Sequence, residues 1–247
     1  MNKVISTLDR LFMSIVGPSG SGKTDLIFKM LTSKTFYPNF ETIIYFYQHE
    51  QPKYRDMEKK LNIEFKKING FELISQLENC LLIFDDSCED LFNDKEFSKL
   101  ATAGRHKILS VIFVKHNLFQ QGKWSRTIDL NTSHIILFKS PRDIQQISFI
   151  GRQLDNTNFL KTSYELATKD PYGHLLIDLN PSTSDSLRFC SNVVPPGPSV
   201  FYIPPAKAVV TPITNERERT IYTEANAATL RRATTLLSKE RSQRQFP

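Results

Sequence analysis

The sequence predicts an α/β fold: a mostly parallel sheet flanked by helices. Two observations carry this prediction. Short runs of strand length alternate along the chain with segments of helical periodicity. Each of those runs is also nearly all apolar, which is typical of parallel strands covered on both faces. The 247 residues suffice for one large α/β domain with a real core or for two small ones.

The first half of the chain supplies the following elements in order. A strand over 12–17 leads into a glycine-rich loop, and a helix over 23–33 follows because Leu26, Ile27, Met30 and Leu31 share one face. We then predict a β-branched and aromatic strand over 42–48, a helix opened by Pro52, a short helix over 69–79, a buried strand over 80–86, and a helix over 94–105 that stops at Gly104.

The second half continues the alternation of strands and helices as far as Val194, where the alternation ends. Strands are predicted over 109–117, 134–140 and 174–180, helices over 141–154 and 156–168, and one more possible strand over 187–194, while 125–131 is ambiguous. After Val194, five prolines within eleven residues break any element. We therefore divide the chain into a folded domain over 1–194 and a tail over 195–247. The tail is Pro-rich and then basic, with a possible amphipathic helix over 224–240, and we expect it to order only on a partner, if at all.

Composition limits the classes of protein to consider. No apolar run approaches the roughly 20 residues of a membrane span, and the N-terminus is too polar for a secretory signal. We therefore expect an intracellular, soluble protein without a membrane partner. The three cysteines, Cys80, Cys88 and Cys190, have no paired spacing, which argues against a disulfide framework or a zinc site. From Pro195 onward, eight basic and four acidic residues carry +4 of the formal net charge of +6, and a basic tail suits either a polyanion or plain solvent.

The segment GPSGSGKT matches the pattern G-x-x-x-x-G-K-[ST] of a phosphate-binding loop. Glycines let the backbone curl so that several N–H groups point at phosphate, and the helix that begins near Lys23 adds its positive end. Lys23 is expected to reach the β- and γ-phosphates, and the Thr24 hydroxyl to hold Mg²⁺. The predicted nucleotide-binding residues are Gly17, Pro18, Ser19, Gly20, Ser21, Gly22, Lys23 and Thr24.

Two carboxylates end the buried strand of CLLIFDD, at the sheet edge where ligands bind in open parallel sheets. Asp85 is expected to hold Mg²⁺ through water, and Asp86 to orient or deprotonate the attacking water. An Asp pair after a strand is also ordinary turn chemistry, which is the alternative interpretation.

The next strand ends in Lys115, His116 and Asn117, between the two strands of the predicted site. Asn117 is preferred over His116 as the polar sensor of phosphate or water, because an amide both donates and accepts at any pH. A neighbouring subunit's arginine often stabilises a transferring phosphate. The sequence alone does not choose among its candidates, which are Arg105, Arg126, Arg142 and Arg152.

The segments GPSGSGKT, LLIFDD, ATAGRHKILSVIFVKHNLF and RTIDLNTSHIILFKSPRD together resemble the FtsK/HerA superfamily of P-loop ATPases. More narrowly, they look like the genome-packaging ATPases of double-jelly-roll DNA viruses, including those encoded by Polinton/Maverick elements. The resemblance spans about residues 11–194. The first two motifs are shared by many ATPases, and the run from Gly104 to Asp143 is the discriminating part.

This resemblance implies a RecA-like (ASCE-type) sheet and ring homo-oligomers that translocate double-stranded DNA into a capsid, using ATP and Mg²⁺. It implies that Lys23, Asp86 and Asn117 are catalytic, that Thr24 and Asp85 are the magnesium residues, and that an arginine acts in trans, for which we name Arg142. Asp86 stands where relatives often have Glu, and His116 departs from a common Thr-Gln type of ending. Capsid proteins are further implied partners. A virus-encoded protein of this kind would act in the host cell, including the nucleus, and transiently at the capsid.

Three rival functions remain open on the same core. A helicase or another nucleic-acid-remodelling ATPase would be expected to carry an added DNA-binding domain. A small-molecule kinase with the same loop should act without DNA. A non-catalytic nucleotide-binding scaffold would explain the departure at Asp86 as lost hydrolysis.

Overall fold

The computed structural model describes residues 5–6, 11–33, 35–37, 40, 42–47, 49–61, 64–67, 80–85, 88–103, 110–195 and 197–204. The chain divides into two units, Met1–Pro204 and Pro205–Pro247, and every described residue belongs to the first. The predicted helices over 69–79 and 224–240 and the predicted stop at Gly104 lie outside the described residues.

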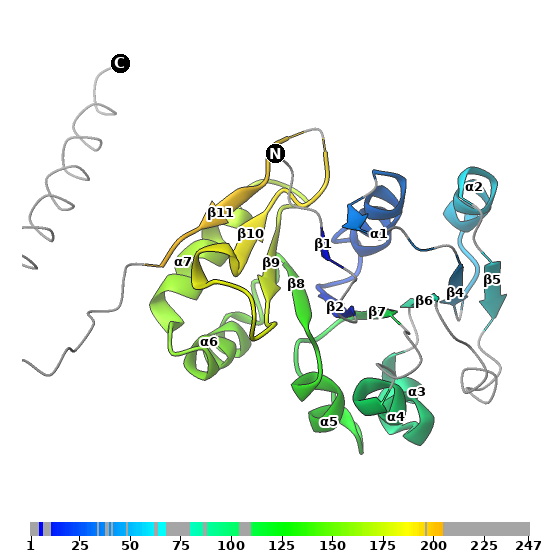
Figure 1. Ribbon diagram of the computed structural model, residues 1–247, viewed down its shortest axis with the longest axis horizontal. Coiled ribbons are helices and arrows are strands. Elements are labelled where there is room, and N and C mark those ends of the chain that lie inside the picture. The colour runs from blue at the N-terminus through cyan, green and yellow to red at the C-terminus, as the bar shows by residue number, and fades with distance from the viewer. Residues whose placement is uncertain are drawn as a thin grey trace, which may run out of the picture. The chain divides into compact units, whose positions relative to one another are not determined.

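The described part of the first unit is built on a nine-stranded sheet (Figure 1). Six neighbouring strands are parallel, and three more are added antiparallel at one edge. The order across the sheet is β5 (Glu64–Lys67), β4 (Ile43–Tyr47), β6 (Leu81–Asp85), β7 (Ser110–Lys115), β2 (Phe12–Val16), β8 (His134–Phe138), β9 (His174–Asp178), β10 (Phe189–Ser191) and β11 (Val200–Tyr202). A separate parallel pair joins β1 (Ile5–Ser6) to β3 (Phe36–Tyr37).

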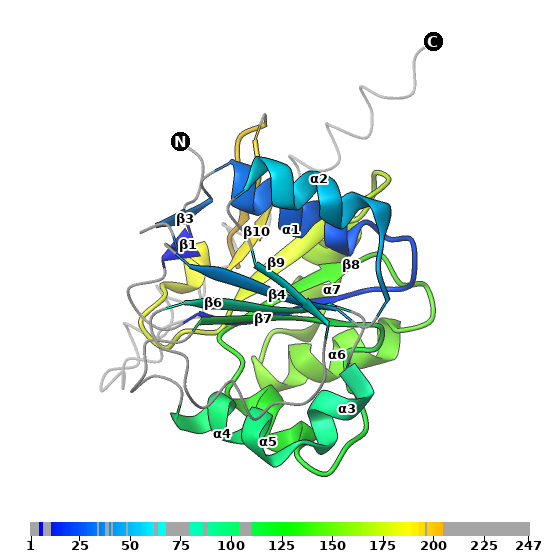
Figure 2. The ribbon, with the colours of Figure 1, turned by 90° about the vertical axis from the view of Figure 1, so that its right-hand side faces the viewer.

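Helices cover both faces of this sheet, as Figure 2 shows. One face carries α1 (Lys23–Thr32) and α2 (Pro52–Lys60). The other carries α3 (Cys88–Asn93), α4 (Lys95–Ala103), α5 (Ser125–Leu130), α6 (Ile144–Gln153) and α7 (Thr157–Ala167), and a short 3₁₀ turn spans Asp185–Leu187. Of the helices in the described part of the chain, none has the length and apolar character needed to cross a membrane.

The alternation of side chains along β2 explains why its sequence is apolar almost throughout. Met13 and Ile15 enter the core beneath α1 and α2, whereas Phe12 and Val16 enter the cores beneath the helices of the opposite face. Both sets are buried, so this strand has no solvent-exposed face that would favour polar residues. The predicted α/β class with a mostly parallel sheet is thus confirmed.

Most predicted elements are present, and three differences have simple causes. Residues 125–130 form a helix, which buries Ile128 against the sheet. The strand β5 was not predicted, because its sequence EFKK is too polar to stand out and an edge strand needs only one partner. The strand β11 also escaped prediction, because only the three residues VFY between prolines pair with β10. The domain therefore runs to Pro204, and our boundary at 194 was placed too early.

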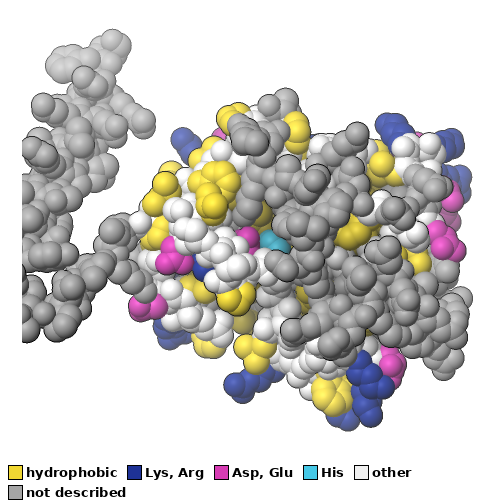
Figure 3. Space-filling view, viewed as in Figure 1, with side chains coloured by type: hydrophobic (Ala, Val, Ile, Leu, Met, Phe, Trp, Pro, Cys, Tyr) yellow, Lys and Arg dark blue, Asp and Glu magenta, His cyan; other side chains and the backbone are white. Residues whose placement is uncertain are grey.

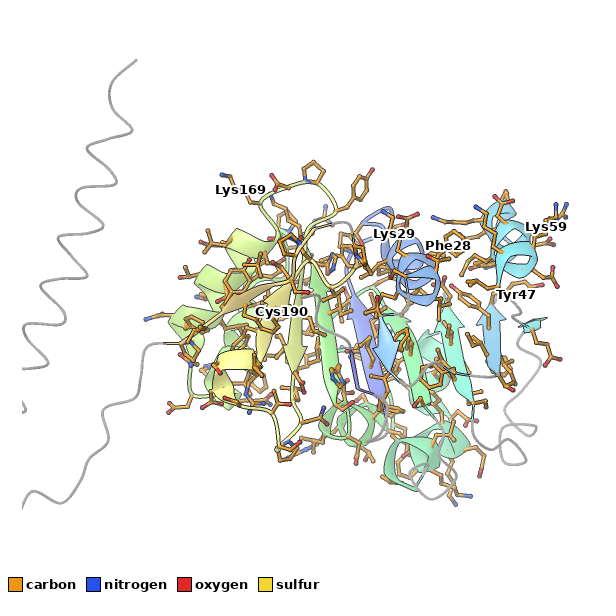
Figure 4. The ribbon with its side chains drawn as sticks, turned by 45° about the horizontal axis from the view of Figure 1, so that its top comes forward. Phe28, Lys29, Tyr47, Lys59, Lys169 and Cys190 are labelled. Carbon is orange, nitrogen blue, oxygen red and sulfur yellow. The ribbon has the colours of Figure 1, made fainter. Side chains whose placement is uncertain are left out.

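The cysteines fit the expectation of free thiols where they are described. Cys80 directly precedes β6, and Cys190 lies in β10 (Figure 4); both are buried, and the Cys190 thiol donates to the Ser191 carbonyl oxygen at 3.3 Å. The side chain of Cys88 lies outside the described part of the structure.

Candidate functional site: a phosphate loop facing a buried aspartate

The segment GPSGSGKT forms the turn from β2 into α1. Gly20 and Gly22 have φ angles of 75° and 96°, in the left-handed region that side chains with a Cβ rarely adopt. Gly22 is also the N-cap of α1, and its carbonyl oxygen accepts the first helical hydrogen bond, from the Leu26 amide at 2.9 Å. Gly17 packs so closely on β8 that a Cβ there would lie 2.7 Å from the Cβ of Phe138. Backbone conformation and close packing therefore both explain the glycines.

Lys23 begins the helix and folds back over this loop. Its ammonium donates to the carbonyl oxygens of Gly17 at 2.8 Å and Pro18 at 2.9 Å, and the residue is only 6% exposed. Pro18, Ser19 and Gly20 form the exposed tip. The lysine charge and the positive end of the ten-residue helix α1 thus lie at one place, which favours an anion.

Asp85 ends β6 and is 1% exposed. Three hydroxyl groups donate to its Oδ2 atom: Thr24 at 2.9 Å, Tyr45 at 2.6 Å and Tyr54 at 3.2 Å. The two residues predicted separately to hold Mg²⁺, Thr24 and Asp85, are thus hydrogen-bonded to each other at the sheet edge. The two tyrosines, from β4 and α2, were not predicted. For Tyr45 the sequence shows only a tyrosine within a mostly apolar strand, where a buried phenol usually finds a polar partner, and it does not show which one. Tyr54 lies in a charged helix, whose sequence gives no such signal.

The same residues fit the magnesium ion that the sequence implies. Mg²⁺ takes oxygen ligands and commonly binds through one or two protein groups together with substrate phosphates. The Thr24 hydroxyl and the Asp85 carboxylate supply oxygens 2.9 Å apart, directly beside the phosphate loop. Assigning these two residues to magnesium remains a prediction.

The strand β7 lies between β2 and β6, with Val16 opposite Lys115 and Phe84 opposite Phe113. Its carboxyl end is therefore next to both the phosphate loop and Asp85. Asn117 follows this end by two residues and is exposed. It has the position expected of a polar sensor, and no other observation bears on that role.

Lys115 turns away from this edge into the opposite helical layer. Its ammonium pairs with Asp129 on α5 at 2.7 Å and lies 5.1 Å from the centre of the Phe92 ring. Burial raises the pKa of the Asp129 carboxyl, and the Lys115 charge opposes that rise. Lys115 is 2% exposed, so we assign it a packing role in this layer rather than contact with phosphate.

The remaining predicted residues are scattered or lie outside the description. Asp86 and Arg105 fall outside the described residues. Arg142 is exposed in the turn after β8, at the same edge of the sheet as the phosphate loop. Arg126 lies exposed on α5, and Arg152 on α6 lies 5.3 Å from the centre of the Phe149 ring. A single chain does not test an arginine that acts in trans, so Arg142 stays a prediction.

The strand order and the phosphate loop define the class of fold: a P-loop NTPase core in which one strand separates the loop strand from the aspartate strand. Solved structures with similar folds include genome packaging NTPase B204 from Sulfolobus turreted icosahedral virus 2 with ATP-gammaS (18% identity, 71% of this chain and 95% of that chain, TM-score 0.48). They also include B204, the DNA-packaging ATPase from Sulfolobus Turreted Icosahedral Virus (15% identity, 80% of this chain and 98% of that chain, TM-score 0.48). A third is the cytoplasmic domain of EssC (12% identity, 87% of this chain and 45% of that chain, TM-score 0.42).

No protein-family model matches the sequence, and no curated protein matches it either. The likenesses to solved structures are distant in sequence and modest in superposition. The class of fold therefore rests on the strand order and the loop geometry described above.

Proposed function

We propose that this protein is an ATP-hydrolysing motor that moves double-stranded DNA, and that its task is to package a viral genome into a capsid. The observation that supports hydrolysis best is the contact between Thr24 and Asp85, which brings the phosphate loop and a buried carboxylate together at one sheet edge. The DNA substrate is supported by the resemblance of the segment from Gly104 to Asp143 and by the net charge of +6.

In the proposed mechanism each residue has a limited task. Lys23 leaves the loop carbonyls and donates to the β- and γ-phosphates, while the loop amides and the end of α1 surround them. Thr24 and Asp85 would hold Mg²⁺, which would neutralise charge on the phosphates. Asp86 takes up or orients a proton of the attacking water, and Asn117 positions that water.

The movement of DNA would be produced by adjacent copies of the chain in a ring. Arg142 of an adjacent copy is our candidate to stabilise charge on the departing phosphate. Basic side chains would then contact DNA phosphates. On the face in Figure 3, the described lysines and arginines lie around the rim and do not gather in one patch.

The test is ATP hydrolysis by the purified protein with and without long double-stranded DNA. We expect stimulation of about tenfold or more by DNA, and its loss in Lys23→Ala. The matched control is Lys99→Ala, which removes an exposed lysine of α4 that pairs with Glu96. An equal rate of hydrolysis with and without DNA, or phosphate transfer to a nucleoside, would contradict the proposed motor and favour a kinase.

Two further measurements separate the parts of the proposal. Asp86→Asn should keep ATP binding and abolish turnover, while Asp56→Asn, on the exposed side of α2, should change neither. Surviving turnover would mean that Asp86 is not the base. Light scattering should show particles several times the 28.5 kDa of one chain when ATP and DNA are present. A persistent monomer would count against the ring.

A further inference from the structure

A cavity of about 440 Å³ lies beside the phosphate loop. It opens between the start of α1, the end of β8 and the loop that joins α7 to β9. Its walls include Gly22, Asp25, Lys29, Phe138, Tyr172 and His174. Figure 4 shows Lys29 on α1, on the side of the helix that faces this loop, which carries Lys169. Its volume is within the roughly 300–1,000 Å³ typical of small-molecule sites.

Flat rings form much of the wall next to the loop. The rings of Phe138 and His174 have centroids 5.3 Å apart. The Tyr172 ring is 71% exposed, and a Cβ added to Gly22 would lie 3.1 Å from its Cδ1 atom. Tyr172 also has a φ of 62°, a costly conformation for a residue with a side chain, and such strain is concentrated at functional sites. A planar ligand would fit against these rings.

His174 lines this cavity, and its ring carries a buried hydrogen-bond acceptor. Its Nδ1 atom lies 3.2 Å from the Tyr172 carbonyl oxygen, and a carbonyl oxygen can only accept, so Nδ1 carries the hydrogen. Burial lowers the pKa of His174 below its usual value; the hydrogen bond to the Tyr172 carbonyl opposes this shift in part, and the charge of Lys29 adds to it. The ring is therefore neutral at neutral pH. The Nε2 atom then has a lone pair and no hydrogen.

The rest of the described protein leaves that lone pair unused. His174 is 8% exposed, and no described group donates to Nε2. A buried acceptor without a donor is costly and rare, so a donor on a ligand in this cavity would stabilise it. The charged groups on the facing helix do not compete for it, because Asp25 cannot donate and Lys29 pairs with Asp25 at 2.8 Å.

We propose that this cavity receives the base of the nucleotide and that His174 Nε2 selects adenine by accepting a hydrogen bond from its exocyclic amine. This inference rests on the proposed function, because it requires that the nucleotide phosphates occupy the adjacent loop. A purine with an oxygen in place of that amine would set two lone pairs against each other. His174 would therefore determine the choice of base without taking part in hydrolysis.

The test is calorimetric titration of the full chain with ADP, inosine diphosphate and tripolyphosphate. We expect ADP to bind about tenfold or more tightly than inosine diphosphate, since the amine is the group that differs at this position. His174→Leu should bring the two affinities together by weakening ADP, while tripolyphosphate binding stays unchanged. His174→Gln, whose amide oxygen can accept, should keep most of the preference.

The outcomes separate this inference from the proposed function. Equal binding of ADP and inosine diphosphate by the unaltered protein would overturn the base assignment, even if both bind well. An equal loss of both nucleotides in His174→Leu would also overturn it. If neither nucleotide nor tripolyphosphate binds, or if binding survives Lys23→Ala, the proposed phosphate site itself is wrong. Should His174→Leu fail to fold, the comparison of ADP with inosine diphosphate on the unaltered protein still decides.

Discussion

Replacing Tyr45 by phenylalanine removes one of the three hydroxyls that hold Asp85. Tyr45 is fully buried, and its bond to Oδ2 is the shortest of the three at 2.6 Å. A hydrogen bond to a charged group contributes about 1.5–3 kcal/mol, and the buried carboxylate cannot replace the lost donor with water. We therefore expect Tyr45→Phe to lower the free energy of unfolding by about 1.5–3 kcal/mol.

The neighbouring tyrosine supplies an internal comparison. Tyr54 donates to the same oxygen from 3.2 Å, so its bond should be weaker, and Tyr54→Phe should cost about 0.5–1.5 kcal/mol. Because the two hydroxyls share one acceptor, their losses should not add. The double variant leaves only the Thr24 hydroxyl of these three donors and should cost more than the sum of the single variants.

Urea unfolding followed by circular dichroism and by the fluorescence of the single tryptophan, Trp124, measures these differences. The control is Tyr172→Phe, which removes a hydroxyl from a ring that is 71% exposed and should leave stability within about 0.5 kcal/mol of the original. A Tyr45→Phe variant as stable as this control would refute the claim that Asp85 is a buried carboxylate held by charge-assisted bonds. So would a larger loss in Tyr54→Phe than in Tyr45→Phe.

Three further predictions concern residues around the site. Gly20→Ala should lower the free energy of unfolding by about 1–2 kcal/mol from backbone strain alone, because a Cβ there meets open space. Gly22→Ala should lower it more, because its Cβ also contacts the Tyr172 ring. Thermal unfolding ranks the two variants, and the reverse order would contradict the loop geometry. Burial raises the pKa of Cys80 to about 11, so iodoacetamide at pH 8 should modify it in urea and spare it in the native protein, as peptide mass mapping would show. For His174, burial lowers the pKa in the folded state, so the unfolded chain takes up the proton first as pH falls below about 6.5, and stability should decline by up to about 1.4 kcal/mol per pH unit. Urea unfolding between pH 7.5 and 5.5 checks this, and His174→Gln should have a flatter profile; an unchanged slope would mean that His174 is not the responsible group.

Much of the fold could be predicted because burial on both faces leaves a clear trace in the sequence. The strands β2, β6, β7 and β8 lie in the middle of the sheet, and each appears as an apolar run. The edges leave no such trace. The strand β5 is polar, and β11 is three residues long between prolines, so only their pairing with β4 and β10 identifies them as strands.

The predictability of the site divides along a similar line. The phosphate loop could be read from the sequence because its residues are contiguous and its glycines are required by backbone conformation or by close packing. Tyr45, Tyr54 and His174 could not, because their hydroxyl or ring nitrogen acquires meaning only from atoms that the sheet brings near. A single sequence shows that a tyrosine or histidine is present and does not show which acceptor or cavity it meets.

Lys115 and Asn117 illustrate why spacing along a strand does not by itself assign a site. Both belong to the polar end of one strand, beside the strand that leads into the phosphate loop. Side chains along a strand point alternately to the two faces of the sheet, so Lys115 lies on the same face as Phe113, in the layer of α3 and α5. There its ammonium pairs with Asp129 and lies over the Phe92 ring. Asn117 comes after the last strand residue, is no longer bound by that alternation, and is exposed at the edge that carries the phosphate loop. The residue type alone favours the lysine as the phosphate contact. The face of the sheet on which its side chain lies excludes Lys115 and leaves Asn117 as the candidate sensor.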